Sequence, residues 1–243
     1  MWKKNQRHLK LCQSTRTNES NNLNLCRYCF KDVHDHEDLI HYLSKSSIIC
    51  GNCRQQLKAL YAYYQIQEME VFAFYEYNQF LEGMIFQYKE GRDTALKDVF
   101  FYDIREYIEK NYKGYTIVLM PSSTQKNQER GFYAMLEMTK QIKLKKISPF
   151  LKTKDMKQSK QRIEARQNID EIMILNQTMT LPDTPLLLLD DVMTSGSTLH
   201  RAYTLLKGHR YPNKIAVLAL HDLLLVHKSK KCRKLRWKKL VNK

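Results

Sequence analysis

The stretch over residues 186–198 constrains the fold of this chain more than any other. It reads LLLLDDVMTSGST, and an amphipathic segment follows it over residues 199–206. The run of leucines is too short for most helices, which favours a buried parallel strand. Two carboxylates, a loop of small polar residues and a helix come next. This succession predicts an α/β protein whose central strand ends at a polar loop.

The residues after the predicted strand are of types that hold a phosphate. Loop amides and hydroxyls can surround an anion at a helix N-terminus, where the helix dipole also favours negative charge. Gly196 lets the backbone approach a ligand because it has no side chain. The two aspartates offer acceptors to a sugar attached to that phosphate. The candidate residues are Asp190, Asp191, Thr194, Ser195, Gly196, Ser197 and Thr198.

This order of residues resembles the signature of type I phosphoribosyltransferases. In that family the acidic pair holds ribose hydroxyls and the loop holds the 5-phosphate of phosphoribosyl pyrophosphate. The resemblance implies an α/β fold that is type I phosphoribosyltransferase-like, with a doubly wound, mainly parallel sheet. It also implies Mg²⁺ as a companion of phosphoribosyl pyrophosphate. No residue stands out as a general acid or base, so we assign no catalytic residue.

A second strand is expected over residues 115–120, followed by a polar loop and a helix over residues 131–142. A strand that ends in a loop with basic residues is where a doubly wound sheet binds anions. The candidates for a pyrophosphate loop are Ser122, Lys126 and Arg130. A solvated loop with surface cations remains the alternative.

Two Cys-x-x-Cys pairs precede this domain, Cys26 with Cys29 and Cys50 with Cys53. Their separation fits a tetrahedral four-cysteine site for structural Zn²⁺. Disulfides are disfavoured in a reducing cytosol, and a redox Cys-x-x-Cys normally occurs once. Histidines between the pairs, at positions 34, 36 and 41, could replace a ligand.

Hydrophobic periodicity predicts the remaining helices and strands. We expect helices over residues 57–69, 80–88 and 94–112, and strands over residues 71–77 and 214–221. The domain organisation that follows is a polar lead-in (1–23), a zinc module (24–56), a phosphoribosyltransferase-like domain (57–225) and a basic tail (226–243). No apolar run reaches the length of a membrane-spanning helix, so we expect a cytoplasmic protein.

The charge balance points to a polyanionic partner. Lys and Arg number 41 against 25 Asp and Glu, which gives a net charge of +16. Such an excess is typical of proteins that bind nucleic acid or membrane headgroups. The candidates for DNA binding are Lys152, Lys154, Lys157, Lys160, Arg162, Arg166 and Trp237. Two alternatives remain open: residues 152–168 form a mobile lid, and the tail is a solvated helix end.

Several short motifs, taken in order, resemble the ComF family of bacterial late-competence proteins. After the cysteine pairs come Gln87-Tyr88-Lys89-Glu90-Gly91, Arg130-Gly131-Phe132, then Gln158, Arg166 and Asn168, and finally the 186–198 stretch. The resemblance implies a role in DNA uptake across the membrane during transformation. It implies single-stranded DNA and a helicase-like competence ATPase as partners, at the inner face of the membrane. An active phosphoribosyltransferase with an unknown acceptor is the alternative.

Overall fold

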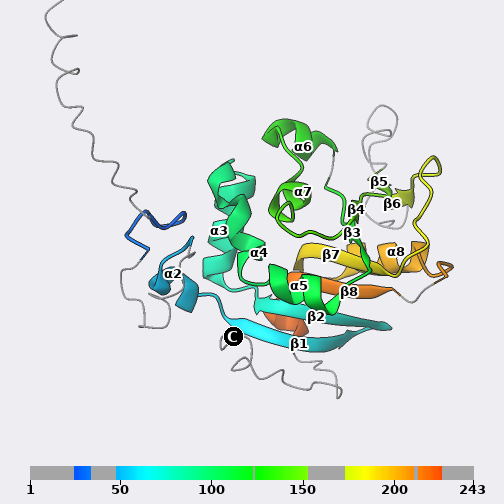
Figure 1. Ribbon diagram of the computed structural model, residues 1–243, viewed down its shortest axis with the longest axis horizontal. Coiled ribbons are helices and arrows are strands. Elements are labelled where there is room, and N and C mark those ends of the chain that lie inside the picture. Colours follow the sequence, from blue (N-terminus) through cyan, green and yellow to red (C-terminus); the bar gives the residue numbers. More distant parts are fainter. Residues whose placement is uncertain (1–24, 34–47, 123, 153–172, 211–212, 226–243) are drawn as a thin grey trace, which may run out of the picture.

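A six-stranded sheet of order β1-β2-β8-β7-β3-β4 forms the centre of the molecule (Figure 1). The computed structural model describes residues 25–33, 48–122, 124–152, 173–210 and 213–225. All neighbouring strands are parallel except the antiparallel β1–β2 pair. The strands are β1 (Ala59–Ile66), β2 (Met69–Glu76), β3 (Thr116–Leu119), β4 (Lys146–Ile147), β7 (Leu186–Met193) and β8 (Lys214–Leu220). The predicted mixed α/β fold with a mainly parallel sheet is therefore confirmed.

The strand predicted from the leucine run is an inner strand of this sheet. β7 pairs with β3 on one side and with β8 on the other, both in parallel register. Its four leucines are fully buried. A parallel strand that is covered on both faces needs apolar side chains on both, which is why the run is continuous and does not alternate with polar residues.

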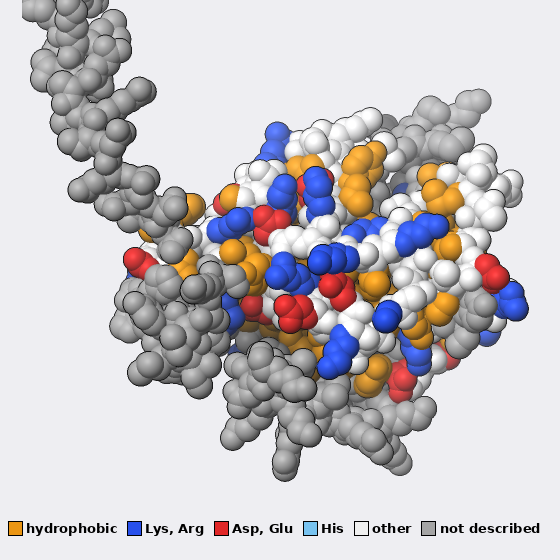
Figure 2. All heavy atoms as spheres, in the orientation of Figure 1, with side chains coloured by type: hydrophobic (Ala, Val, Ile, Leu, Met, Phe, Trp, Pro, Cys, Tyr) orange, Lys and Arg blue, Asp and Glu red, His pale blue; other side chains and the backbone are white. Residues whose placement is uncertain are grey.

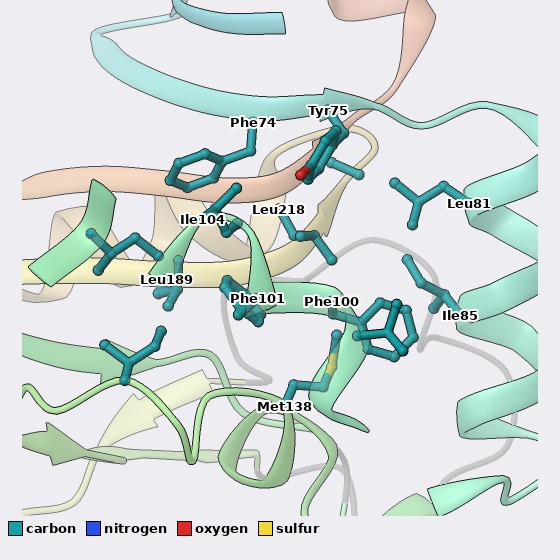
Figure 3. Packing of buried hydrophobic residues seen from close by; sticks show 14 of the residues in the cluster. Phe74, Tyr75, Leu81, Ile85, Phe100, Phe101, Ile104, Met138, Leu189 and Leu218 are labelled. Carbon is teal, nitrogen blue, oxygen red and sulfur yellow. The ribbon is translucent and has the colours of Figure 1, made fainter. Parts of the chain in front are cut away.

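One face of the sheet is covered by helices from the middle of the chain. These are α3 (Gln79–Lys89), the 3₁₀ helix η1 (Thr94–Asp98), α4 (Val99–Tyr102), α5 (Arg105–Asn111) and α7 (Ala134–Met138). Figure 3 shows their apolar side chains meeting those of the strands, with Phe74, Leu189 and Leu218 facing Leu81, Ile85, Phe100, Phe101, Ile104 and Met138. We call this side the α3 face.

The opposite face is covered by α8 (Ser197–Leu205) and by a small hairpin of β5 (Phe150–Lys152) and β6 (Met173–Leu175). Leu199 and Ala202 of α8 pack there with Phe150 and Met173 of the hairpin. Because these residues form a cluster with Leu188 of β7, this side has its own apolar core. We call it the α8 face.

The helix expected over residues 57–69 is wrong. The short helix α2 (Gly51–Gln55) ends earlier, and the segment forms strand β1. Ala62, Tyr64 and Ile66 are buried at alternate positions, which is the period of a strand. Tyr61 lies at φ +44° beside a shift in the β1–β2 register. That bulge interrupts the alternation, which made the sequence pattern ambiguous.

Two other boundaries differ from expectation. Residues 94–112 form η1, α4 and α5 in succession and not one helix, although Leu96, Phe100, Ile104 and Ile108 are buried as expected. The polar segment after β3, expected to be a loop, contains helix α6 (Thr124–Arg130), and only residues 134–138 of the following expected helix are helical. Short helices of this kind depend on tertiary packing, which local periodicity does not report.

Candidate functional site

The loop after β7 borders a polar hollow at the start of α8. The hollow is open to solvent and is lined by Asp190, Val192, Met193, Thr194, Ser195, Gly196, Ser197, Thr198 and Leu199. Six of the seven candidates from the sequence are therefore brought together. Asp191 is not among the lining residues.

Gly196 gives the loop its shape. It lies at φ +81°, in the left-handed region, and serves as the N-cap of α8. A Cβ at this position would come within 2.4 Å of the Met193 Cε. The Ser195 and Ser197 hydroxyl oxygens lie 3.0 Å apart across the glycine. Hydroxyls and the first turn of a helix are thus presented to one small space, as an anion site requires.

The turn between β1 and β2 packs against this loop and contacts the first turn of α8. A Cβ on Gly196 would lie 3.8 Å from the Ile66 Cγ2, so the β1 end packs against the loop. The Glu68 carboxylate lies 2.8 Å from Nε2 of His200, in the first turn of α8. A backbone hydrogen bond within Glu68 and the nearby His200 lower the pKa of this carboxyl. No pattern in the sequence indicated this contact.

Asp190 and Asp191 lie in different surroundings. Successive side chains of a strand alternate between faces, and the four leucines of β7 follow this rule. Leu188 belongs to the core of the α8 face and Leu189 to that of the α3 face. Strict alternation does not continue beyond them, because Val192 packs on the α3 face and Met193 on the α8 face. The contacts place the aspartates directly: Asp190 lines the hollow beside α8, whereas Asp191 is paired with Lys89 of α3.

Burial raises the pKa of Asp190 to about 7, and the negative charge of Asp191 acts in the same direction. Lys89 and Lys152 oppose this rise through their positive charges. Lys152 is the last residue of β5, whose Phe150 packs on the α8 face. Its ammonium therefore adds positive potential on the side of the hollow.

Asp191 is paired with Lys89 at the end of α3. The two side chains are 9% and 19% exposed, so the ion pair is largely excluded from water. The next residue, Glu90, binds Arg130 Nη2 at 2.6 Å. Lys89 and Glu90 belong to a motif that the sequence singled out without a role for either. Their partners lie far away in the sequence, so only the fold reveals the contacts.

The three pyrophosphate-loop candidates lie on the segment after β3. Ser122 is half-buried directly beyond that strand, and Lys126 is exposed on α6. The Arg130 side chain is only 6% exposed and is turned toward Glu90. None of the three is among the described residues that line the hollow.

The four cysteines of the two pairs converge on one point. All four Sγ atoms lie within 4.8 Å of one another. The Cys26–Cys53 and Cys29–Cys50 sulfur pairs are 3.8 and 3.5 Å apart. Tetrahedral Zn²⁺ with Zn–S bonds of about 2.3 Å requires sulfur–sulfur distances of about 3.8 Å. The donor set and its spacing thus fit a metal ion of this kind.

Thiol acidity differs among these cysteines. Burial raises the pKa of Cys26, but amide hydrogen bonds from Cys29, Cys50 and Tyr28 outweigh it and bring the pKa to about 7. Burial and the neighbouring sulfurs raise the pKa of Cys53. Because a metal binds thiolates, an ion in this position would replace the protons that burial otherwise favours.

The cysteine module is packed against the rest of the protein. Arg27 Nη1 lies 2.5 Å from the Asp98 carboxylate in η1. The Tyr28 ring meets the edge of Phe80 in α3 at 5.0 Å between centroids. Cys26, Cys50 and Cys53 share one buried cluster with the core of the α3 face. The described residues of the module therefore share the core of the α3 face.

Most of the DNA-binding candidates lie outside the described residues. These are Lys154, Lys157, Lys160, Arg162, Arg166 and Trp237. In Figure 2 many Lys and Arg side chains on the visible face are interspersed with acidic ones. Among the described residues, no helix is long and apolar enough to cross a membrane.

Comparison with known proteins gives two relatives, both competence proteins named ComFC. The protein from Streptococcus pneumoniae is 27% identical over 135 residues, which is 56% of this chain and 60% of the relative. The protein from Bacillus subtilis is 25% identical over 130 residues, 53% of this chain and 54% of the relative. The chain thus matches a little over half the length of each. No protein-family model matches the chain. The two relatives confirm the resemblance that the ordered motifs indicated: the chain is similar to ComFC competence proteins.

Proposed function

We propose that this protein is a late-competence factor that supports DNA uptake across the membrane in natural transformation. Its similarity to two competence proteins is the observation that carries the proposal. In this role it acts on single-stranded DNA, together with a helicase-like competence ATPase, at the inner face of the membrane. The net charge of +16 suits a protein whose partner is a polyanion.

The proposed ligand of the hollow is phosphoribosyl pyrophosphate, in a phosphoribosyltransferase-like fold. Residues 194–198 would hold the 5-phosphate, because they combine hydroxyls with the first turn of a helix. Asp190 would accept a hydrogen bond from the ribose. Mg²⁺ binds through few carboxylates plus substrate phosphates, which suits a site with one acidic lining residue.

Thermal stabilisation tests this ligand directly. The purified protein should unfold at a higher temperature with phosphoribosyl pyrophosphate and Mg²⁺ than with either alone, because a ligand that binds only the folded state stabilises it. Ribose 5-phosphate and inorganic pyrophosphate serve as partial ligands. An unfolding temperature that does not respond to the complete ligand, at concentrations where it would saturate an ordinary site, would refute the site.

The competence role is tested separately in the host. Deleting the gene should lower transformation by externally supplied DNA, while growth is unchanged. Restoring the gene should restore transformation. A deletion strain that takes up and integrates DNA at the normal frequency would contradict the role, whatever the ligand of the hollow.

For the cysteine cluster we propose one structural Zn²⁺, held by Cys26, Cys29, Cys50 and Cys53. Four protein ligands leave no open position on a tetrahedral ion, so the metal serves folding and not catalysis. Elemental analysis of freshly purified protein should find one zinc per chain. Protein that is folded and free of metal would argue against this assignment.

A further inference from the structure

The two adjacent aspartates of the 186–198 stretch have separate tasks. We infer that Asp190 alone serves the ligand, whereas Asp191 is a positioning residue that joins β7 to the end of α3 through Lys89. This inference rests on the phosphoribosyl site proposed above and departs from the expectation that both carboxylates hold the ribose.

Both carboxylate oxygens of Asp191 are engaged within the protein. Oδ1 accepts a hydrogen bond of 2.8 Å from the Val192 amide, and Oδ2 is paired with the Lys89 ammonium. Asp191 is also one of the few buried polar residues of the described chain, at 6% exposure. A ribose hydroxyl would have to compete with Lys89 for this carboxylate, and the largely buried ion pair would be weakened.

Residues at the end of α3 also contact the Arg130-Gly131-Phe132 motif and its surroundings. Tyr88 is buried, donates to the Ala134 carbonyl at 3.1 Å and lies against the Phe132 ring at 5.1 Å. Glu90 holds Arg130, as described above. Three successive residues, Tyr88, Lys89 and Glu90, therefore contact the Arg130-Gly131-Phe132 segment and the acidic pair.

This arrangement has a mechanical consequence for the site. Asp191 is bonded to Asp190 through one peptide, and its amide donates to the Asp190 Oδ1 at 2.9 Å. Holding Asp191 at the end of α3 therefore restrains Asp190, which lines the hollow beside α8. Lys89 is not among the described residues that line the hollow, so it acts on ligand binding through Asp191 and through its charge near Asp190.

Isosteric variants separate the two tasks. With phosphoribosyl pyrophosphate and Mg²⁺ as the probe, Asp190→Asn should lower affinity about tenfold to a hundredfold, the loss expected for a hydrogen bond to a charged acceptor. Asp191→Asn should lower the unfolding temperature of the ligand-free protein and change affinity by much less. A folded Asp191→Asn protein that loses as much affinity as Asp190→Asn would overturn the inference.

A ligand-free double-mutant cycle tests the role of Asp191 independently of the ligand. Lys89→Met leaves a buried carboxylate without its partner, so this variant should unfold at a lower temperature. Adding Asp191→Asn should restore part of the loss, because no unpaired buried charge remains. Additive effects would refute the pairing role. The exposed Arg210–Asp183 pair, at 3.0 Å with side chains 71% and 67% exposed, is the matched control and should show almost no coupling.

Ligand affinity and the unfolding temperature of the ligand-free protein test the proposed function and the role of Asp191 separately. If the wild-type protein does not bind phosphoribosyl pyrophosphate, the proposed ligand and the task of Asp190 are both refuted. The cycle at Lys89 and Asp191 then still decides whether Asp191 joins β7 to α3.

Discussion

At the scale of single residues, the geometry of the candidate site depends on Gly196. Its φ of +81° is a conformation that costs other residues about 1–3 kcal/mol. The role of this glycine was predictable from the sequence, since the loop was expected to approach a ligand. The contact of its position with Ile66 was not, because Ile66 lies on β1, far away in the sequence.

Replacing this glycine tests the loop. Gly196→Ala should destabilise the protein by about 1–3 kcal/mol in urea unfolding and weaken stabilisation by phosphoribosyl pyrophosphate, because the loop must shift to relieve the strain. Gly208→Ala is the control, since a Cβ there meets nothing within 4 Å. Equal effects of the two substitutions would show that the conformation of Gly196 does not matter.

The raised pKa of Asp190 makes stability depend on pH. An unfolded aspartate has a pKa of about 3.9, and Asp190 in the folded protein has a pKa of about 7. The folded state binds the proton more tightly, so this residue contributes most stability at low pH and loses the contribution as the pH rises to about 7.

Comparison with a variant isolates this contribution from those of other groups. Relative to Asp190→Asn, the wild-type protein should lose stability steadily from about pH 4 to about pH 7 and change little above that. Urea unfolding of both proteins across this range measures the difference. A difference that is constant with pH would mean that Asp190 is not perturbed by its surroundings.

At the scale of elements, the sequence predicted best where a segment is buried on all sides or lies within one long helix. β7, β8, β2 and α3 were expected within a few residues of their observed bounds. β1 was missed because its tyrosines and its bulge hide the two-residue period. The ion pairs of Lys89 and Glu90 were not predictable, because they join α3 to β7 and α6, which are distant in sequence.

The cysteine module is the element that should depend most on its metal. Cys50→Ser removes one of four thiolates, so we expect loss of zinc and local unfolding of residues 25–33 and 48–56, since metal binding and folding of such a module share their free energy. The contacts of Arg27 with Asp98 and of Tyr28 with Phe80 should be lost with it.

Elemental analysis and the unfolding temperature measure this outcome. Cys12→Ser is the matched control, because Cys12 belongs to neither Cys-x-x-Cys pair. Full retention of zinc in Cys50→Ser would imply a different ligand set, for which the histidines at positions 34, 36 and 41 would be tested next.

At the scale of the whole molecule, the two faces of the central sheet are covered by different elements. One face carries the cysteine module and α3, and the other carries the hollow, α8 and the β5–β6 hairpin. Lys152, which the sequence grouped with DNA-binding residues, lies on the second face and acts on Asp190. Its charge therefore belongs with the hollow as well as with the basic segment that follows it.

The excess of positive charge leads to a prediction about the chain as a whole. The protein should bind single-stranded DNA with an affinity that falls steeply with salt, at a log–log slope of about −0.7 per neutralised phosphate. Removing residues 226–243 should make the slope shallower, because the tail is rich in Lys and Arg.

Trp237→Ala should weaken binding with little change in slope, since base stacking contributes about 1–3 kcal/mol without releasing counterions. Trp237→Phe, which keeps an aromatic ring, is the control and should retain most of the affinity. Fluorescence anisotropy with labelled oligonucleotides, run beside sedimentation with anionic vesicles, distinguishes nucleic acid from a membrane surface. Binding to vesicles, with no affinity for any single strand at low salt, would refute the DNA partner and assign the charge to the membrane.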